Sequence, residues 1–138
     1  MRRHLGWVIC LGLAAAGCGG SDRPGTKEDM LRTSLNDVGD IYRAFVVMNK
    51  TPPKTLGNLA RFERMSPAGF DALRSGKVVV RFGANLPDTD PEPGKSSSDE
   101  VLAYEKQVPE SGGKVLMLDR TIRSMSADEF KAAPKAGL

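Results

Sequence analysis

The sequence predicts an α+β domain, in which a long N-terminal helix packs on a small three- to four-stranded antiparallel sheet and a short helix follows. Three observations lead to this prediction. Apolar residues recur at helical spacing between positions 31 and 45, β-branched segments are concentrated between positions 77 and 125, and a helix-capping pattern begins at position 126. Helical and strand segments that are separated along the chain are typical of α+β folds.

The first helix has a clear start and a clear end. Thr26 followed three residues later by Asp29 approximates a capping box, which satisfies free backbone amides at a helix N-terminus. Apolar residues then follow with a 4-3-4-3 spacing, at Leu31, Leu35, Val38, Tyr42 and Phe45. Thr51-Pro52-Pro53 ends the helix, because proline lacks the amide donor and restricts the residue before it. We therefore expect a helix that starts near Lys27 and ends near Lys50.

The apolar stripe of this helix has two interpretations. It either packs on the protein's own domain, or it forms a partner-binding or coiled-coil surface. In the second case the partner-binding residues are Leu31, Leu35, Val38 and Tyr42.

Two short helical segments and four strand candidates follow. The segment 56–62 has one apolar face, and Ser66-Pro67 is an N-cap and first-turn pair for a helix that ends at Gly76. The strand candidates are the segments 77–82, 101–104, 114–118 and 121–125, the last two joined by a two-residue turn at Asp119-Arg120. Ser126 with Glu129 is a second capping box, which starts a helix over 127–133 that Pro134 ends.

The first 18 residues form a separate unit. Arg2, Arg3 and His4 are positive, and the apolar run from Leu5 to Ala16 is too short to cross ~30 Å of hydrocarbon as a helix. Small residues precede Cys18. This arrangement resembles a bacterial lipoprotein signal peptide, which implies removal of residues 1–17 and lipidation of Cys18 by diacylglycerol and palmitate-type chains. An ordinary cleaved signal and a retained apolar tail are the alternatives.

The resemblance also defines the other segments of the chain. Residues 18–26 would be the lipidated cysteine and a flexible tether, 27–134 one folded domain, and 135–138 a disordered tail. The protein would be anchored in the membrane of the cell envelope, facing the periplasm or the cell surface. Gly19, where an Asp would retain a lipoprotein in the inner membrane, favours the outer membrane.

Charge and residue counts exclude several functions. Arg2 and Arg3 supply two units of the formal net charge of +3, and the other basic residues are scattered, so no nucleic-acid surface is expected. His4 and Cys10 lie in the signal, so the mature chain has no histidine and no unmodified cysteine for a zinc site or a nucleophile. Glu105 and Asp119 are the one pair of carboxylates considered for acid/base catalysis. We expect a protein that is not an enzyme.

The acidic loop is the candidate metal site. Carboxylates occur at Asp88, Asp90, Glu92 and Asp99, among proline, glycine and serine residues. Calcium binds six to eight oxygen ligands of this kind, but the spacing of an EF-hand is absent. The alternative is a solvated loop without bound metal.

Three short motifs carry a second resemblance. They are Thr51-Pro52-Pro53-Lys54-Thr55-Leu56, Val101-Leu102-Ala103-Tyr104-Glu105-Lys106 and the segment 112–119. With the order of the elements, they resemble type II secretion pseudopilins and the pseudopilin-like proteins of planctomycete bacteria over about residues 28–133. The chain departs from that pattern by having the Cys18 segment where those proteins have a long hydrophobic assembly helix. The resemblance implies a small interaction domain.

These observations together lead to one expected function and one alternative. We expect a lipid-anchored, non-catalytic envelope protein that is held on the membrane through Cys18 and binds an unknown envelope protein. The alternative is a lipoprotein that binds calcium or a small ligand with loop 88–100. Apart from the covalent lipid and this calcium ion, no cofactor is expected.

Overall fold

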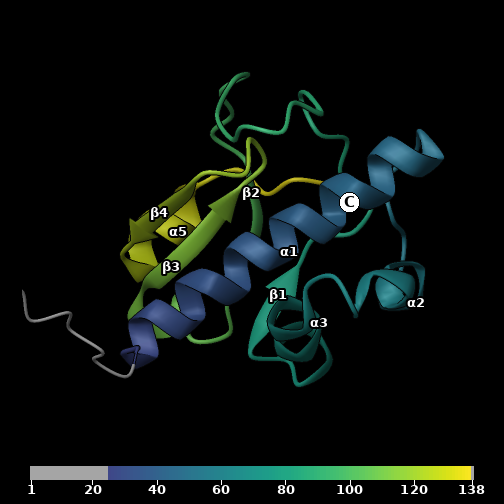
Figure 1. Cartoon of the computed structure of the whole chain (residues 1–138). Helices are drawn as coiled ribbons and strands as arrows, with labels where there is room; N and C mark the ends of the chain where they lie inside the picture. The colour runs from purple at the N-terminus through teal and green to yellow at the C-terminus, as the bar shows by residue number, and fades with distance from the viewer. Residues whose placement is uncertain (1–24, 138) are drawn as a thin grey trace, which may run out of the picture.

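The computed structural model describes residues 25–137 of the 138-residue chain. It confirms the predicted α+β fold, with a long helix on one face of a four-stranded antiparallel sheet and a short helix near the end (Figure 1). Cys18, the predicted signal peptide and the predicted tether up to residue 24 lie outside the described residues.

The long helix α1 spans Lys27–Asn49 and begins as predicted. The Thr26 backbone amide donates to Asp29 Oδ2 at 2.9 Å, and the Asp29 amide donates to Thr26 Oγ1 at 3.2 Å, which completes the capping box. At the other end Lys50 adopts a left-handed conformation, with φ of 60°, and its amide donates to the Val46 carbonyl. The chain leaves the helix there and enters the Pro52-Pro53 segment.

Short helical segments lie between α1 and the sheet, and one more lies between two strands. α2 (Leu56–Leu59) runs directly into a 3-10 turn, η1 (Ala60–Phe62), and α3 (Pro67–Arg74) starts at the predicted proline. The fourth helix, α4 (Val108–Ser111), lies between two strands and was not predicted from the sequence. Pro109 is tolerated in α4 because it occupies the first turn, where its missing amide would have no helical partner.

The sheet has the order β1-β2-β3-β4, and every neighbouring pair is antiparallel. Its strands are Val78–Val80, Val101–Glu105, Gly113–Met117 and Ile122–Met125. The first strand is shorter than the predicted segment 77–82, because Gly83 turns the chain toward Pro53, whose carbonyl accepts the Gly83 amide at 2.8 Å.

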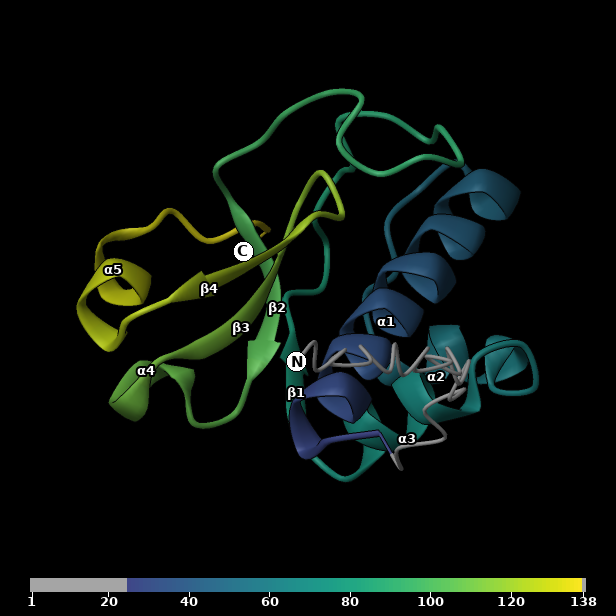
Figure 2. The same cartoon turned by 60° about the vertical axis from the view of Figure 1, so that its left-hand side comes forward.

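Two hydrophobic clusters fill the two faces of the sheet. α1 and α3 cover one face, where Leu35, Val38 and Leu116 belong to the larger cluster. The helix α5 (Ala127–Ala132) covers the other face, where Phe130 packs with Val101 and Val115. Figure 2 shows α1 and α5 on opposite sides of the sheet. The predicted Ser126–Glu129 capping box starts α5.

The β3–β4 turn differs from the predicted two-residue turn. The Met117 amide donates to the Thr121 carbonyl, the Arg120 amide donates to the Met117 carbonyl, and Arg120 has a φ of 65°. This is a three-residue loop over 118–120 with a left-handed last position, a place that glycine usually takes. The longer loop removes the steric problem of forcing two successive non-glycine residues to positive φ.

The predicted disordered tail is wrong for residues 135–137. The Ala136 amide donates to the Val101 carbonyl, the Val101 amide donates to the Pro134 carbonyl, and Ala136 is fully buried. Arg81 Nε also donates to the Ala136 carbonyl at 3.2 Å. The tail runs parallel to the start of β2 and takes a sheet position that β1 does not reach.

Candidate functional site

The acidic loop is organised around an arginine. The side chain of Arg120 is 3% exposed, and its guanidinium donates to the carbonyls of Asp90, Pro91 and Glu92. Arg120 is the last residue of the β3–β4 turn, where it has a left-handed conformation. From there its side chain reaches the acidic loop. The N–H donors of this buried guanidinium are therefore satisfied mainly by backbone carbonyls.

A second arginine and one carboxylate complete the arrangement. Arg43 Nε, from α1, donates to the carbonyls of Thr89 and Asp90 at 2.9 Å each. Asp88 Oδ1 lies 3.7 Å from Arg120 Nη2, and Asp88 Oδ2 accepts the Ser96 amide at 2.7 Å. Hydrogen bonding by the Ser96 side chain holds the pKa of Asp88 below its usual value, with a smaller contribution from Arg120. Burial lowers the pKa of Arg120.

The carboxylates of this loop have separate partners. Asp90 accepts the Glu92 amide, Glu92 pairs with Lys95 at 2.9 Å, and Asp99 pairs with Arg123 at 3.1 Å. Within residues 25–137 no three acidic, histidine or cysteine side chains are grouped to hold a metal ion. The structure thus does not bring Asp88, Asp90, Glu92 and Asp99 together, and calcium binding at this loop stays a prediction.

Burial of Arg120 has no direct signal in the sequence. The available signal was indirect: Arg120 stands in a hairpin turn at a position where a residue with positive φ is favoured, and it is not glycine.

The predicted partner-binding stripe is part of the core. Leu35, Val38 and Tyr42 have no exposed surface, and Tyr42 Oη donates to the Ala84 carbonyl at 2.8 Å. Leu31 is partly exposed. The partner-binding interpretation of this stripe is wrong for the three buried residues, because α3 and the sheet already cover that face of α1.

The two carboxylates considered for catalysis accept hydrogen bonds from backbone amides instead. Glu105 Oε2 accepts the Lys114 amide at 3.0 Å, and Asp119 Oδ1 accepts the Thr121 amide at 3.0 Å. Both residues are buried. In residues 25–137 no buried side-chain nitrogen or oxygen lacks a hydrogen-bond partner. The buried ionisable groups in this part of the chain thus form hydrogen bonds that stabilise the fold.

Exposed apolar side chains occur at the C-terminal end of α1 and after η1. Met48 and Met65 are 63% and 66% exposed, and Val47 is 36% exposed. Met48 and Met65 each lie three residues after one member of the Phe45–Phe62 ring pair, whose centroids are 6.5 Å apart. We call Val47, Met48 and Met65 the methionine surface.

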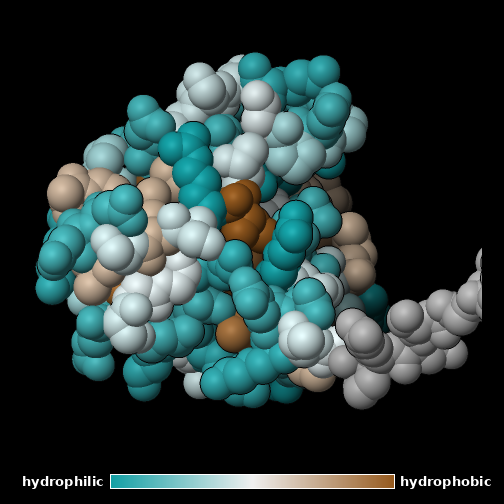
Figure 3. Space-filling model, turned by 90° about the vertical axis from the view of Figure 1, so that its left-hand side faces the viewer, coloured by the Kyte–Doolittle hydropathy of each residue, from teal (hydrophilic) through white to brown (hydrophobic). Residues whose placement is uncertain are grey.

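The β4 edge of the sheet is polar. Arg123 and Ser124 are exposed there, and a charged residue on an edge strand opposes pairing with another strand. Figure 3 shows this side of the molecule as mostly hydrophilic, with a small hydrophobic area near its centre.

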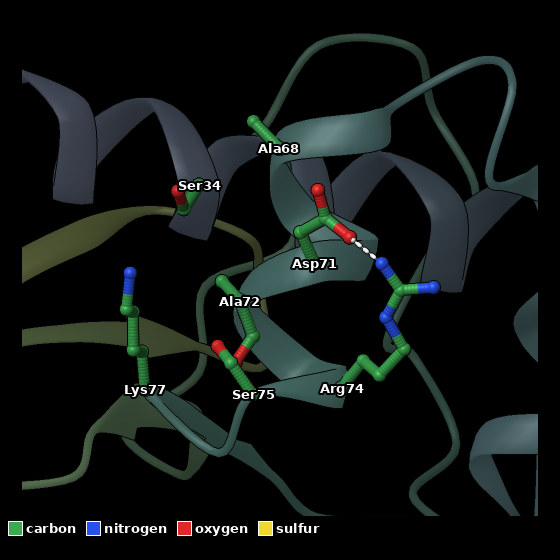
Figure 4. Close-up of a pocket in the computed structure, with 7 residues that line it drawn as sticks. All are labelled: Ser34, Ala68, Asp71, Ala72, Arg74, Ser75 and Lys77. Atoms are coloured by element: carbon green, nitrogen blue, oxygen red, sulfur yellow. Dashed lines mark hydrogen bonds and ion pairs between the residues drawn. The ribbon is translucent and has the colours of Figure 1, made fainter.

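A groove separates the first turns of α1 from α3. One part has a volume of about 340 Å³ and is lined by Ser34 of α1, by Ala72 and Ser75 at α3, and by Lys77 (Figure 4). Asp71 and Arg74 form an ion pair on its rim. The adjoining part, about 490 Å³, is more apolar and includes Gly25, Met30 and Leu31.

Comparisons with known proteins add no family to this description. No protein-family model, no curated protein and no solved structure matches the chain. In the part of the chain that the structure describes, none of the helices has the length and apolar character needed to cross a membrane.

Proposed function

We propose that this protein is a lipid-anchored, non-catalytic protein of the bacterial cell envelope, and that it binds another envelope protein. The membrane attachment is supported by the sequence around Cys18, where a basic start, an apolar run and small residues precede the cysteine. Acyl chains on Cys18 would hold the protein on a membrane, because each buried methylene contributes ~0.8 kcal/mol. The resemblance to pseudopilin-like proteins remains part of this proposal.

The methionine surface is the observation that supports a binding role. Val47, Met48 and Met65 expose apolar area, whereas the buried ionisable groups Glu105, Asp119 and Arg120 are all bound to backbone. Methionine is flexible and polarisable, and it is common on surfaces that adapt to a partner. This distribution favours binding over catalysis.

Lipidation is tested by metabolic labelling with an alkyne fatty acid in cells that express the full chain. We expect label on the wild-type protein and its recovery with membranes. Cys18→Ala should remove both, whereas Cys10→Ala should leave the labelling intact. Equal labelling of wild type and Cys18→Ala would contradict the anchor.

Protein binding is tested by photo-crosslinking in cells from residue 48 or residue 65. We expect one discrete crosslinked band at both positions. The control position is Asp128, which is exposed on α5, away from the methionine surface. The interaction role would be overturned if residues 48 and 65 gave no crosslink, or gave the same pattern as residue 128.

A further inference from the structure

Three lysines lie together at one end of the molecule. Lys27 and Lys77 line the same groove beside Gly25, and the Lys106 amide donates to the Lys77 carbonyl at 2.9 Å. All three side chains are exposed. None of them has an ion-pair partner among residues 25–137.

Several other charged groups at this end have partners. Lys114 pairs with Glu28 at 3.1 Å, Arg74 pairs with Asp71, and Asp29 caps the start of α1. Glu105 is buried and bound to the Lys114 amide. Glu110 on α4 and Arg32 on α1 are exposed. The exposed ammonium groups of Lys27, Lys77 and Lys106 are therefore accessible to an external anion.

Two of these lysines, Lys27 and Lys77, line an apolar hollow together with Asp29, whose carboxylate caps α1. Met30 is 62% exposed, and it lines the 490 Å³ part of the groove with Leu31, Ala68 and Ala72. Ammonium groups around an apolar centre suit the boundary between lipid headgroups and hydrocarbon, where lysine stems lie on apolar surface and their charges reach phosphate.

This end of the molecule lies close to Cys18 along the chain. Gly25 lines the same hollow, and it stands only seven positions after Cys18. Seven residues reach at most ~25 Å when fully extended. A lipid on Cys18 would thus keep Gly25 and the three lysines close to the membrane.

We infer that the surface formed by Lys27, Met30, Lys77 and Lys106 rests on an anionic phospholipid membrane. The inference rests on the proposed lipid anchor and adds an orientation to it. The lysines contact phosphate groups, and Met30 enters the headgroup region. Loop 88–100 lies at the opposite end of the molecule from the start of α1 (Figures 1 and 2), so it points away from the membrane.

The orientation also determines where the methionine surface lies. Met30 and Met48 are near opposite ends of α1, and 18 residues of helix separate them by ~27 Å. Met48 therefore lies well beyond the headgroups, where a partner protein would have access to it.

Fluorescence quenching by lipid tests this orientation. The lipidated mature protein is reconstituted in phosphatidylethanolamine vesicles containing 30% phosphatidylglycerol (roughly the charge of a bacterial membrane) and a lipid with a headgroup-level nitroxide. Met30→Trp, Met48→Trp and Met65→Trp are compared as single-tryptophan proteins, because Trp7 is the one natural tryptophan and lies in the segment that the proposed cleavage removes. The three methionines are matched in exposure, at 62%, 63% and 66%.

We expect at least twofold stronger quenching for Met30→Trp than for the other two variants, and a smaller difference without phosphatidylglycerol. Equal quenching of all three variants on membrane-bound protein would overturn the orientation while leaving the anchor intact. Failure of the protein to bind vesicles at all, together with absent lipid labelling, would contradict the anchor instead.

Lysine labelling provides a measurement without substitutions. The lipidated wild-type protein is acetylated on vesicles and in detergent, and each lysine is quantified by mass spectrometry. We expect protection on vesicles at Lys27, Lys77 and Lys106, and equal labelling in both conditions at Lys54 and Lys131, which are also exposed. Equal labelling of both groups on vesicles would contradict the inference.

Discussion

Arg120 Nη2 lies 3.7 Å from Asp88 Oδ1, and this contact joins the tip of the β3–β4 turn to the start of the acidic loop. The same guanidinium binds three carbonyls of that loop. A segment with the composition of a solvated loop is thus held at a defined place on the domain.

The first prediction concerns Lys50 and Arg120, the two non-glycine residues with positive φ within residues 25–137. Arg120→Gly relieves the left-handed backbone but removes the contacts to loop 88–100, so we expect a loss of about 2–4 kcal/mol in the free energy of unfolding. Lys50→Gly is the matched control, because Lys50 has a similar φ of 60° and an exposed side chain. It should be neutral or stabilising by up to ~1 kcal/mol. Urea unfolding measures both, and equal effects would contradict the role of the Arg120 side chain.

The second prediction concerns the close crossing of α1 and α3. A Cβ atom at Gly69 would lie 2.5 Å from Asp37 Cβ, whereas one at Gly39 would lie 3.5 Å from the nearest atom of Leu116. We expect Gly69→Ala to destabilise the protein by about 2–3 kcal/mol, because the helices must move apart. Gly39→Ala should change stability by less than ~1 kcal/mol, since helix propensity favours alanine. Thermal unfolding of the two variants decides this, and comparable melting temperatures would be inconsistent with the crossing.

The third prediction concerns the buried hydroxyl of Tyr42. Burial raises the pKa of Tyr42 to about 12, and the hydroxyl donates to the Ala84 carbonyl. Ultraviolet titration should therefore show a phenol that ionises near pH 12, and Tyr42→Phe should remove this step. The variant should also lose about 1–2 kcal/mol of stability, because the buried carbonyl loses its donor. If the high-pH step persisted in Tyr42→Phe, the assignment would be wrong.

The fourth prediction compares two carboxylates with opposite pKa shifts. The pKa of Asp88 is lowered by hydrogen bonding from Ser96, so Asp88 stabilises the fold at neutral pH and this contribution is lost as the pH falls below about 4. Asp88→Asn should therefore weaken the dependence of stability on acid pH. Circular dichroism at a series of pH values gives the measurement.

Asp37 is the control, because burial raises its pKa. The native state then binds the proton more tightly, so stability falls as the pH rises through the usual carboxyl range near 4. Asp37→Asn should be more stable than wild type at pH 7, with Asn accepting the Gly69 amide as Asp37 does at 3.2 Å. This advantage should disappear at pH 3. If the stability of Asp88→Asn and Asp37→Asn had the same pH dependence, the opposite pKa shifts of Asp88 and Asp37 would be wrong.

The fifth prediction concerns calcium. The loop carboxylates have separate protein partners, so millimolar calcium should leave the melting temperature unchanged within about 1 °C, whereas a ligand at 100 times its Kd would add ~2.7 kcal/mol. Magnesium at equal ionic strength is the control for salt effects. A rise with calcium alone would support the metal-binding hypothesis.

The helices with local signals were predictable from the sequence. The Thr26–Asp29 and Ser126–Glu129 capping boxes are contacts between residues three positions apart, so they mark the starts of α1 and α5 directly. The four strands were likewise found from short β-branched or apolar runs, although β1 is shorter than expected.

The candidate sites depended on distant contacts, and these were not predictable. The fate of the apolar stripe depended on whether α3 and the sheet would cover Leu35 and Val38. Burial of Arg120 required carbonyls from a loop about 30 residues earlier in the chain. No local pattern encodes either contact, because each one forms only when the domain has folded.

The sheet position held by Ala136 has a consequence for how the domain is made. The edge of β2 at Val101 is closed by Pro134 and Ala136, so it stays open until these residues are available. Synthesis and export deliver the N-terminal part of a chain first. A chain exported as we propose would reach the far side of the membrane with α1 and most of the sheet before this edge could close. Until residues 134–136 arrived, the domain would thus have an unpaired sheet edge at Val101.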